Sequence, residues 1–288
     1  QNMPVVRALP AYEVMMGDHP LKQPLPTQSV DQIDPFLLIH HHAIQISAGT
    51  DRWNAGVGPH PHRGFSPVTF MWSGGVHHRD SRGNNSVVDD GGVQWMDAGL
   101  GIIHSERPPA KLAEEGGMQE IIQIWINTPS ARKMEEPKYM PLQKDEMPEV
   151  PGHPDLRITS GTPIVQASEG PLKSSYPITA AHGAMEADIA ATFEVKSGEN
   201  GLLYLLDGAG HLEGYGLIEA HMLYQLNAGT YTFTPSEKTK VFFIAAAPIN
   251  EKVESYGPFV MTNQTEIMEA MRDYQQGKMG FLVERDLP

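Results

Sequence analysis

The sequence predicts an all-β protein of two barrels or sandwiches, joined by a proline-rich linker and followed by one short helix. Its 288 residues include 28 glycines and 24 prolines, and so many chain-breaking residues favour short strands and turns over long helices. Apolar runs of strand length recur between Gly, Pro, Asn and Asp residues. Length suits two domains, and hydrophobic residues, at 40% of the chain, suffice for two cores.

Strands are expected wherever an apolar run lies between two turn signals. In chain order these runs are residues 35–39, 67–72, 86–89, 92–96, 121–126, 156–159, 191–195, 202–206, 221–226, 230–233 and 240–245. Residues 70–75 and 204–210 look alike, because each is an apolar strand that closes on a glycine-rich turn. This likeness indicates a weak internal duplication.

A linker is expected between residues 129 and 154, where six prolines, including the last residue of the range, stand among charged residues. No strand or long helix is expected to run through this composition. The predicted domains are therefore an N-terminal barrel at residues 1–130, a linker at 131–154 and a C-terminal barrel with a helix at 155–288.

The C-terminal helix is predicted from its capping pattern. Asn263 and Glu266 match a capping box, in which the first side chain accepts from the third amide of the helix. Ile267, Met271 and Tyr274 then fall on one helical face, and Gly277 provides a stop. We expect a surface helix that packs this stripe on a barrel.

Composition excludes several classes of function. The chain has 21 basic and 35 acidic residues, a net charge of −14 that opposes direct nucleic-acid binding and fits a basic protein partner. It has no cysteine, which excludes disulfides, cysteine zinc sites and thiol nucleophiles. No apolar run reaches the ~18–20 residues of a membrane span, and residues 1–7 lack signal-peptide features. A soluble, cytoplasmic protein is expected.

His60 and His62 form the first half of a candidate metal site. Pro61 forces His60 into extended backbone and is itself fixed near a φ of about −65°. In such a segment, side chains two residues apart leave the same face, with Cα atoms about 6.6 Å apart. The two imidazoles can thus converge on one ion, and their backbone is stiffened before the ion binds.

His104 and Glu106 repeat this spacing in the second half. Leu100, Ile102 and Ile103 predict burial, and a buried, unpaired glutamate is costly unless a cation compensates it. Three imidazoles and one carboxylate suit a single divalent ion with two open positions. Fe, Mn, Co, Ni, Cu and Zn all remain open, and Fe(II) is favoured because mixed histidine and carboxylate shells host oxygen chemistry.

These motifs resemble those of the pirin family, which has two cupin domains. The similar segments are residues 60–65 (HPHRGF), 77–81 (HHRDS), 94–106 (QWMDAGLGIIHSE), 123–127 (QIWIN) and 256–261 (YGPFVM). The resemblance covers nearly the whole chain. It implies two tandem cupin (jelly-roll) β-barrels, one mononuclear iron in the N-terminal barrel and none in the C-terminal barrel. It also implies that His60, His62, His104 and Glu106 are the ligands.

The resemblance further implies quercetin 2,3-dioxygenase activity on a flavonol with O2. Glu106 is then the expected catalytic base for the flavonol 3-hydroxyl. Phe65, Met71, Trp95 and Gln123 are candidates for the cavity wall because they are near the ligands in sequence. The alternative is a regulatory metalloprotein whose metal redox state controls binding to a transcription factor or a metabolic enzyme.

Two positions depart from the family pattern. Ser66 stands where many members have a glutamate, and His40 replaces a typical aspartate after the residue 35–39 strand. His40 shares a face with His42, so it either lines the mouth of the cavity or lies at a solvated strand end.

Overall fold

The computed structural model describes residues 5–285, so residues 1–4 of the chain start considered above lie outside the described part. It divides into two compact units. Unit 1 comprises Gln1–His42 and Gln143–Pro248, and unit 2 comprises Ala43–Leu142 and Ile249–Pro288. Each unit therefore draws segments from two separate stretches of the chain. The division at residues 130 and 155 stays a prediction.

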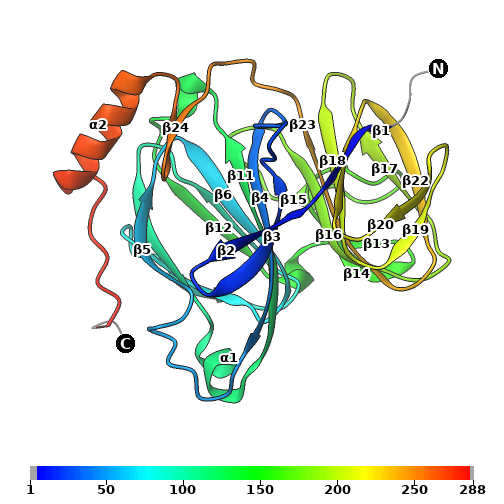
Figure 1. Cartoon of the computed structure of the whole chain (residues 1–288), viewed down its shortest axis with the longest axis horizontal. Coiled ribbons are helices and arrows are strands. Elements are labelled where there is room, and N and C mark those ends of the chain that lie inside the picture. The colour runs from blue at the N-terminus through cyan, green and yellow to red at the C-terminus, as the bar shows by residue number, and fades with distance from the viewer. Residues whose placement is uncertain (1–4, 286–288) are drawn as a thin grey trace. The chain divides into compact units, whose positions relative to one another are not determined.

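Unit 2 is built from two sheets that carry all the segments expected at the metal site. One contains β12, β9, β6 and β11 side by side in this order, and the other contains β5, β10, β7 and β8. Their bounds are β5 (Val57–His62), β6 (Phe65–Ser73), β7 (Val76–Asp80), β8 (Asn85–Val88), β9 (Val93–Asp97), β10 (Ile102–Arg107), β11 (Gly117–Asn127) and β12 (Lys138–Leu142). Strands β5, β6, β11 and β12 are labelled in Figure 1. The unit also contains α1 (Ala110–Glu115), η1 (Ser130–Arg132), β24 (Glu254–Tyr256), β25 (Phe259–Met261) and α2 (Gln264–Gln275).

Unit 1 packs an eight-stranded sheet and a four-stranded sheet around its own core. The larger has the order β1-β21-β18-β23-β16-β14-β13, with β15 on β14, and the smaller has the order β17-β22-β19-β20. Their bounds are β1 (Val5–Pro10), β13 (Glu149–Val150), β14 (His153–Gly161), β15 (Gly170–Pro171), β16 (Thr179–Met185), β17 (Ala191–Val195), β18 (Asn200–Asp207), β19 (Ala209–Leu212), β20 (Gly216–Glu219), β21 (Met222–Leu226), β22 (Gly229–Pro235) and β23 (Thr239–Ala246). The unit also contains four further elements, β2 (Tyr12–Met16), β3 (His19–Leu25), the first part of β4 (Phe36–Ile46) and η2 (Lys144–Glu146).

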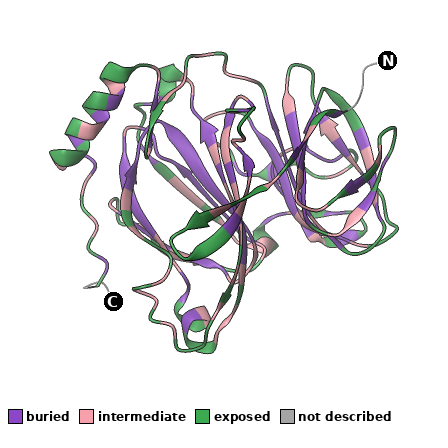
Figure 2. Ribbon diagram, in the orientation of Figure 1, coloured by how far each residue is buried: buried purple, intermediate pink, exposed green. Residues whose placement is uncertain are grey.

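Apolar residues of both sheets form the core of unit 1. Phe193, Leu203, Leu205, Phe233 and Phe243 are fully buried inside it, and long stretches of its strands are buried (Figure 2). Buried and partly exposed residues alternate along β17, because side chains two residues apart share a face of a strand, whereas consecutive residues of β18 and β23 are buried. Each expected strand overlaps an observed one, and the all-β expectation is confirmed.

Neither α-helix in residues 5–285 combines the length and apolarity that a bilayer crossing requires.

The expectation that no strand runs through residues 129–154 is wrong. Strand β12 forms there and pairs with β9, with Tyr139 opposite Met96 and Pro141 opposite Gln94. It is an edge strand, and a proline is tolerated at an edge because one side of the backbone needs no ladder partner. The strand delivers Tyr139 to the region of the metal-site histidines.

Helix α2 begins at the predicted cap. Asn263 Oδ1 accepts a hydrogen bond from the Glu266 amide at 2.9 Å. Glu266 Oε1 accepts from the Thr262 amide at 3.0 Å, one residue earlier than the capping box predicts. The helix lies against β24 and β25 (Figure 1).

The packed face of α2 agrees with the predicted stripe. Ile267 is buried in a cluster with Ala270, and Met271 packs against that cluster. Tyr274 is 40% exposed, but its ring lies 6.5 Å from that of Phe259. Asp273 is also buried on this helix, where it forms an ion pair with Arg63 at 3.0 Å that hydrophobic periodicity does not predict.

Lys133 joins three separate segments of unit 2. Its ammonium is 2% exposed and donates to Gly64 O at 2.7 Å, Asn127 Oδ1 at 2.6 Å and Val260 O at 2.9 Å. Burial lowers its pKa to about 8. Gly64 follows the His60–His62 segment, so Lys133 helps to fix the end of the strand that carries both histidines.

Lys133→Met should lower the free energy of unfolding by about 3 kcal/mol, because an unpaired buried acceptor costs about 1–3 kcal/mol and removal of the buried charge offsets part of the loss. Urea unfolding of metal-free protein measures the change. Lys138→Met, at an exposed position, is the control and should change it by less than about 0.5 kcal/mol. Equal effects of the two substitutions would contradict this role for Lys133.

Candidate metal centre

Three histidines from two neighbouring strands of unit 2 form a compact group. Strands β5 and β10 pair antiparallel, with His60 opposite His104 and His62 opposite Ile102. One ring nitrogen of each of His60, His62 and His104 lies within 4.8 Å of those of the other two. Nitrogens bound about 2.0–2.1 Å from one ion lie about 3–4 Å apart, so small side-chain adjustments suffice. These three residues can hold a metal ion.

The hydrogen bonds of the group leave nitrogen lone pairs available. His60 Nδ1 lies 2.7 Å from Gly58 O and donates to it, which leaves Nε2 as the free acceptor. Among the described residues, His62 Nδ1 and His104 Nε2 are buried without a hydrogen-bond partner. Burial also holds the pKa of His62 and of His104 well below 6.5, so both imidazoles are neutral, as coordination requires. Buried nitrogen lone pairs on neutral rings, without a hydrogen bond of their own, suit the coordination of a metal ion.

Glu106 lies at the edge of the three-histidine group. Its Oε1 lies 3.4 Å from His104 Nε2, and its side chain is 11% exposed. Gln123 Nε2 donates to Glu106 Oε1 at 3.1 Å. Burial raises the pKa of Glu106 to about 7, although the bond from Gln123 opposes the shift. That Glu106 is the fourth ligand stays a prediction.

Metal-free protein should lose stability as pH rises through the range in which Glu106 titrates. Between about pH 4.5 and 7 the folded state holds a proton on Glu106 that the unfolded state releases, so the free energy of unfolding falls with pH. This shift corresponds to at most about 3 kcal/mol. Urea unfolding at about pH 5 and pH 8 should show this fall in the wild type. Glu106→Gln should lack this part of it, and parallel curves would contradict the raised pKa.

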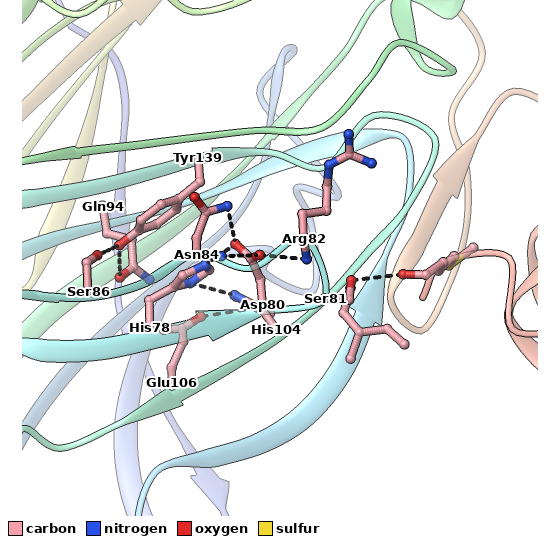
Figure 3. A network of polar contacts seen from close by, with 12 residues as sticks. His78, Asp80, Ser81, Arg82, Asn84, Ser86, Gln94, His104, Glu106 and Tyr139 are labelled. Carbon is pink, nitrogen blue, oxygen red and sulfur yellow. Dashed lines mark hydrogen bonds and ion pairs between the residues drawn. The ribbon is translucent and has the colours of Figure 1, made fainter. Parts of the chain in front are cut away.

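A second group of buried side chains lies behind His104. The His78 ring lies between His104 and Tyr139, and its Nε2 reaches Asp80 (Figure 3). His78 stacks on Tyr139 with ring centroids 3.8 Å apart and an interplanar angle of 5°. Tyr139 also bonds to Gln94 Oε1 at 3.2 Å. Sequence reasoning quoted His78 and Asp80 only as part of a motif, because their proximity to His104 depends on the pairing of β7 with β10.

An aromatic wall lies beside His62. The Phe65 ring lies 5.2 Å from that of His62, and the Trp125 ring lies 5.8 Å from His62 and 4.5 Å from Phe65. Phe65 was predicted from the sequence as a pocket residue, and Trp125 was not. The two-residue spacing of Gln123 and Trp125 on β11, which places both on one face of the strand, was the signal that could have indicated it.

The other proposed pocket residues fall in different places. Met71 packs in a buried cluster with Val76, Val88 and Ile121. Trp95 follows Gln94 on β9, so it points to the opposite face of the sheet, and its ring lies 6.3 Å from that of Phe70. This orientation argues against Trp95 in the pocket wall.

His40 and Ser66, the two departures from the family pattern, both have specific partners. His40 lies on β4 in unit 1, where its Nε2 lies 2.8 Å from Gln23 Oε1 and its ring lies 6.2 Å from that of His42. Its role in a pocket stays a prediction. Ser66 is buried and donates to Asp97 Oδ1 at 2.5 Å. The serine therefore forms a polar contact next to the HPHRGF segment.

The sequence model of the pirin family matches residues 18–126, and that of the pirin C-terminal cupin domain matches residues 180–280. The chain belongs to the pirin family. Pirin-1 from Arabidopsis thaliana is 32% identical to it over 262 residues, which cover 88% of this chain and 86% of Pirin-1.

Solved structures of related proteins confirm the fold. The crystal structure of a quercetin 2,3-dioxygenase from Acinetobacter baumannii matches with a TM-score of 0.87 and 31% identity, covering 97% of this chain and 99% of that one. The bacterial pirin YhhW from Escherichia coli, solved in complex with nickel(II), matches with a TM-score of 0.65 over 84% of this chain and 99% of that one. At 18% identity, the second match shows the fold alone. The all-β, two-cupin fold of the pirin family is thereby confirmed.

Proposed function

We propose that this pirin is a mononuclear metal dioxygenase that cleaves flavonols of the quercetin type with O2. One observation carries the proposal: three buried imidazoles, two of them with unpartnered ring nitrogens, lie beside a carboxyl group whose pKa is about 7. The similarity to the Acinetobacter quercetin 2,3-dioxygenase supports the choice of substrate class.

In this proposal His60, His62, His104 and Glu106 hold the metal ion. Fe(II) is the preferred occupant because open histidine and carboxylate shells suit oxygen chemistry. Mn, Co, Ni, Cu and Zn are the other candidates, and elemental analysis of purified protein distinguishes them. When bound, the metal supplies Lewis-acid stabilisation of the flavonol oxygen and the redox chemistry that O2 requires.

Glu106 receives the proton of the flavonol 3-hydroxyl group. In the metal-free protein burial raises the pKa of Glu106 to about 7, and a bound cation would favour the ionised carboxylate, which is the form that accepts a proton. Gln123 donates to Glu106 Oε1 and thereby limits the rotation of the carboxylate. An ionised carboxylate has about four acceptor positions, so the bond from Gln123 leaves lone pairs that can accept the substrate proton.

The aromatic wall fits a flat phenolic ring. Phe65 is fully buried, and Trp125 and His62 lie within 6 Å of each other by ring centroids. Aromatic rings attract one another in offset or edge-to-face geometry, and such pairs contribute about 0.5–1.5 kcal/mol beyond burial. The wall would therefore orient a flavonol and exclude water from the face where O2 reacts.

Oxygen uptake tests the function directly. Protein loaded with Fe(II) should consume O2 in the presence of quercetin, with loss of quercetin absorbance in equal amount, and metal-free protein should do neither. Kaempferol and myricetin extend the test to flavonols with fewer and more hydroxyl groups. If no flavonol supports O2 uptake with any of the six metals, the dioxygenase is excluded and the regulatory metalloprotein becomes the better interpretation.

A further inference from the structure

A continuous line of hydrogen-bonded side chains leads from Asp80 through His78 to His104. His78 Nε2 lies 2.6 Å from Asp80 Oδ2, and His78 Nδ1 lies 3.4 Å from His104 Nδ1 (Figure 3). The side chains of His78 and Asp80 are completely buried, and that of His104 is 2% exposed. Strand pairing brings these side chains together, because β7 and β10 place Asp80 opposite His104 and His78 opposite Glu106.

Asp80 can only accept hydrogen bonds in this arrangement. Its Oδ1 accepts from the Arg82 amide at 2.9 Å and the Asn84 amide at 3.1 Å, and its Oδ2 accepts from Asn84 Nδ2 at 2.8 Å. Burial by itself would raise the pKa of Asp80, but the hydrogen bonds from His78 and Asn84 outweigh it and hold the pKa below its usual value. The carboxylate is ionised, so the proton of the 2.6 Å bond belongs to His78 Nε2.

The position of that proton determines the rest of the line. A neutral imidazole has one N–H donor and one acceptor nitrogen, so a proton on His78 Nε2 leaves Nδ1 as an acceptor. The only partner that can supply the 3.4 Å bond is then His104 Nδ1–H. A proton on His104 Nδ1 leaves the lone pair of Nε2 directed toward the three-histidine group.

We propose that Asp80 and His78 are positioning residues that fix the tautomer of His104, so that its Nε2 lone pair is available to the metal. This inference rests on the proposed metal site, in which His104 is a ligand. Carboxylate and carbonyl groups that accept a hydrogen bond from the other ring nitrogen of a ligating histidine commonly set its tautomer, and their loss lowers metal affinity by about 10–100-fold. Here an imidazole stands between the carboxylate and the ligand.

Tyr139 holds the intermediate ring in place. It stacks flat on His78, and its hydroxyl group bonds to Ser86 Oγ at 2.8 Å and to Gln94 Oε1 at 3.2 Å. The partners of that hydroxyl group do not include a nitrogen of His78. The stack therefore constrains the ring orientation, and the tautomer depends on Asp80.

Asp80→Asn should reverse the direction of both hydrogen bonds, from His78 to residue 80 and from His104 to His78. The two backbone amides that face Oδ1 require an acceptor there, so the new amide oxygen takes that place and the NH2 group faces His78 Nε2. The Asn84 side chain, which donates to Oδ2 in the wild type, then has to turn its amide so that its oxygen accepts from the new NH2 group. His78 then has to accept at Nε2 and donate from Nδ1, which moves the proton of His104 to Nε2. The comparable change in serine proteases leaves the geometry intact and places the wrong tautomer.

The tautomers are read from the ¹⁵N shifts of the histidine rings in metal-free protein at about pH 8, where histidines of ordinary pKa are neutral. In the wild type we expect protons on His78 Nε2 and His104 Nδ1, and in Asp80→Asn we expect both on the opposite nitrogens. Calorimetric titration with Ni(II), which air does not oxidise, should show at least about tenfold weaker binding by the variant. Tyr139→Phe keeps the stack and is the matched control, with both tautomers unchanged.

A wild-type spectrum with the His104 proton on Nε2, or with His78 doubly protonated, would overturn the proposal even if the variant does not fold. An Asp80→Asn variant that folds with the wild-type tautomers would do the same. These readouts do not require flavonol turnover or a bound metal. A pirin that binds Ni(II) but leaves quercetin intact thus rejects the proposed reaction and leaves the role of Asp80 and His78 standing.

Discussion

Replacement of His104 by alanine should lower metal affinity by about 100-fold or more. A four-ligand metal site is worth about 10–16 kcal/mol, so the loss of one ligand removes about 3 kcal/mol. His104 lies between β5 and β7 on β10, and no neighbouring side chain in the described residues 5–285 joins His60 and His62 in a comparable group. Purified His104→Ala should therefore contain almost no metal by elemental analysis.

His77→Ala is the matched control for this substitution. His77 lies on the neighbouring strand β7, where it is partly exposed and its Nε2 lies 2.6 Å from Asn85 Oδ1. This variant should retain the metal content of the wild type. Retention of a full complement of metal by His104→Ala would remove His104 from the ligand set and with it the basis of the proposed reaction.

Glu106→Gln should reduce flavonol turnover per bound metal ion by about 10²–10⁴-fold, the usual contribution of a general base. Glutamine has the same shape and can still accept from Gln123 Nε2, but it cannot take up the proton of the 3-hydroxyl group. The variant should fold as the wild type does. O2 uptake, divided by the metal content of each preparation, separates the loss of the base from any loss of metal.

The control for this experiment is Glu115→Gln, at an exposed position on α1. It changes the net charge by the same amount and should leave turnover within about twofold, since exposed substitutions change little. If Glu106→Gln retained the wild-type rate per metal ion, the proton would have to be taken up elsewhere and Glu106 would keep at most a ligand role.

Local chemistry explains why the histidine group could be predicted. Pro61 restricts the backbone of β5, and the two-residue spacing of His60 and His62 sets a shared face whatever the rest of the fold does. Proximity in sequence to a ligand does not decide which face of a neighbouring strand a side chain occupies, so it could not distinguish Trp95, on the face opposite Gln94, from Gln123, whose amide donates to Glu106. Pocket roles for both residues stay predictions.

Pairing between distant segments was beyond the reach of the sequence. His78 meets His104 only through the register of β7 and β10, and Tyr139 meets His78 only through an edge strand in a segment that looked like a linker. The ion pair that Asp273 of α2 forms with Arg63 likewise joins two distant segments. Such contacts join residues 26 to 210 positions apart in the chain, and a single sequence carries no signal for them.

The closing segment of unit 2 has a consequence for the order in which the protein matures. The Arg63 amide donates to Pro258 O, the Val260 amide donates to Arg63 O, and the guanidinium of Arg63 pairs with Asp273. Arg63 directly follows the strand that carries His60 and His62, and these partners are synthesised about two hundred residues later in the chain. We therefore expect the site to bind metal only once the chain has been completed, so a nascent chain arrested before residue 258 should contain little metal by elemental analysis.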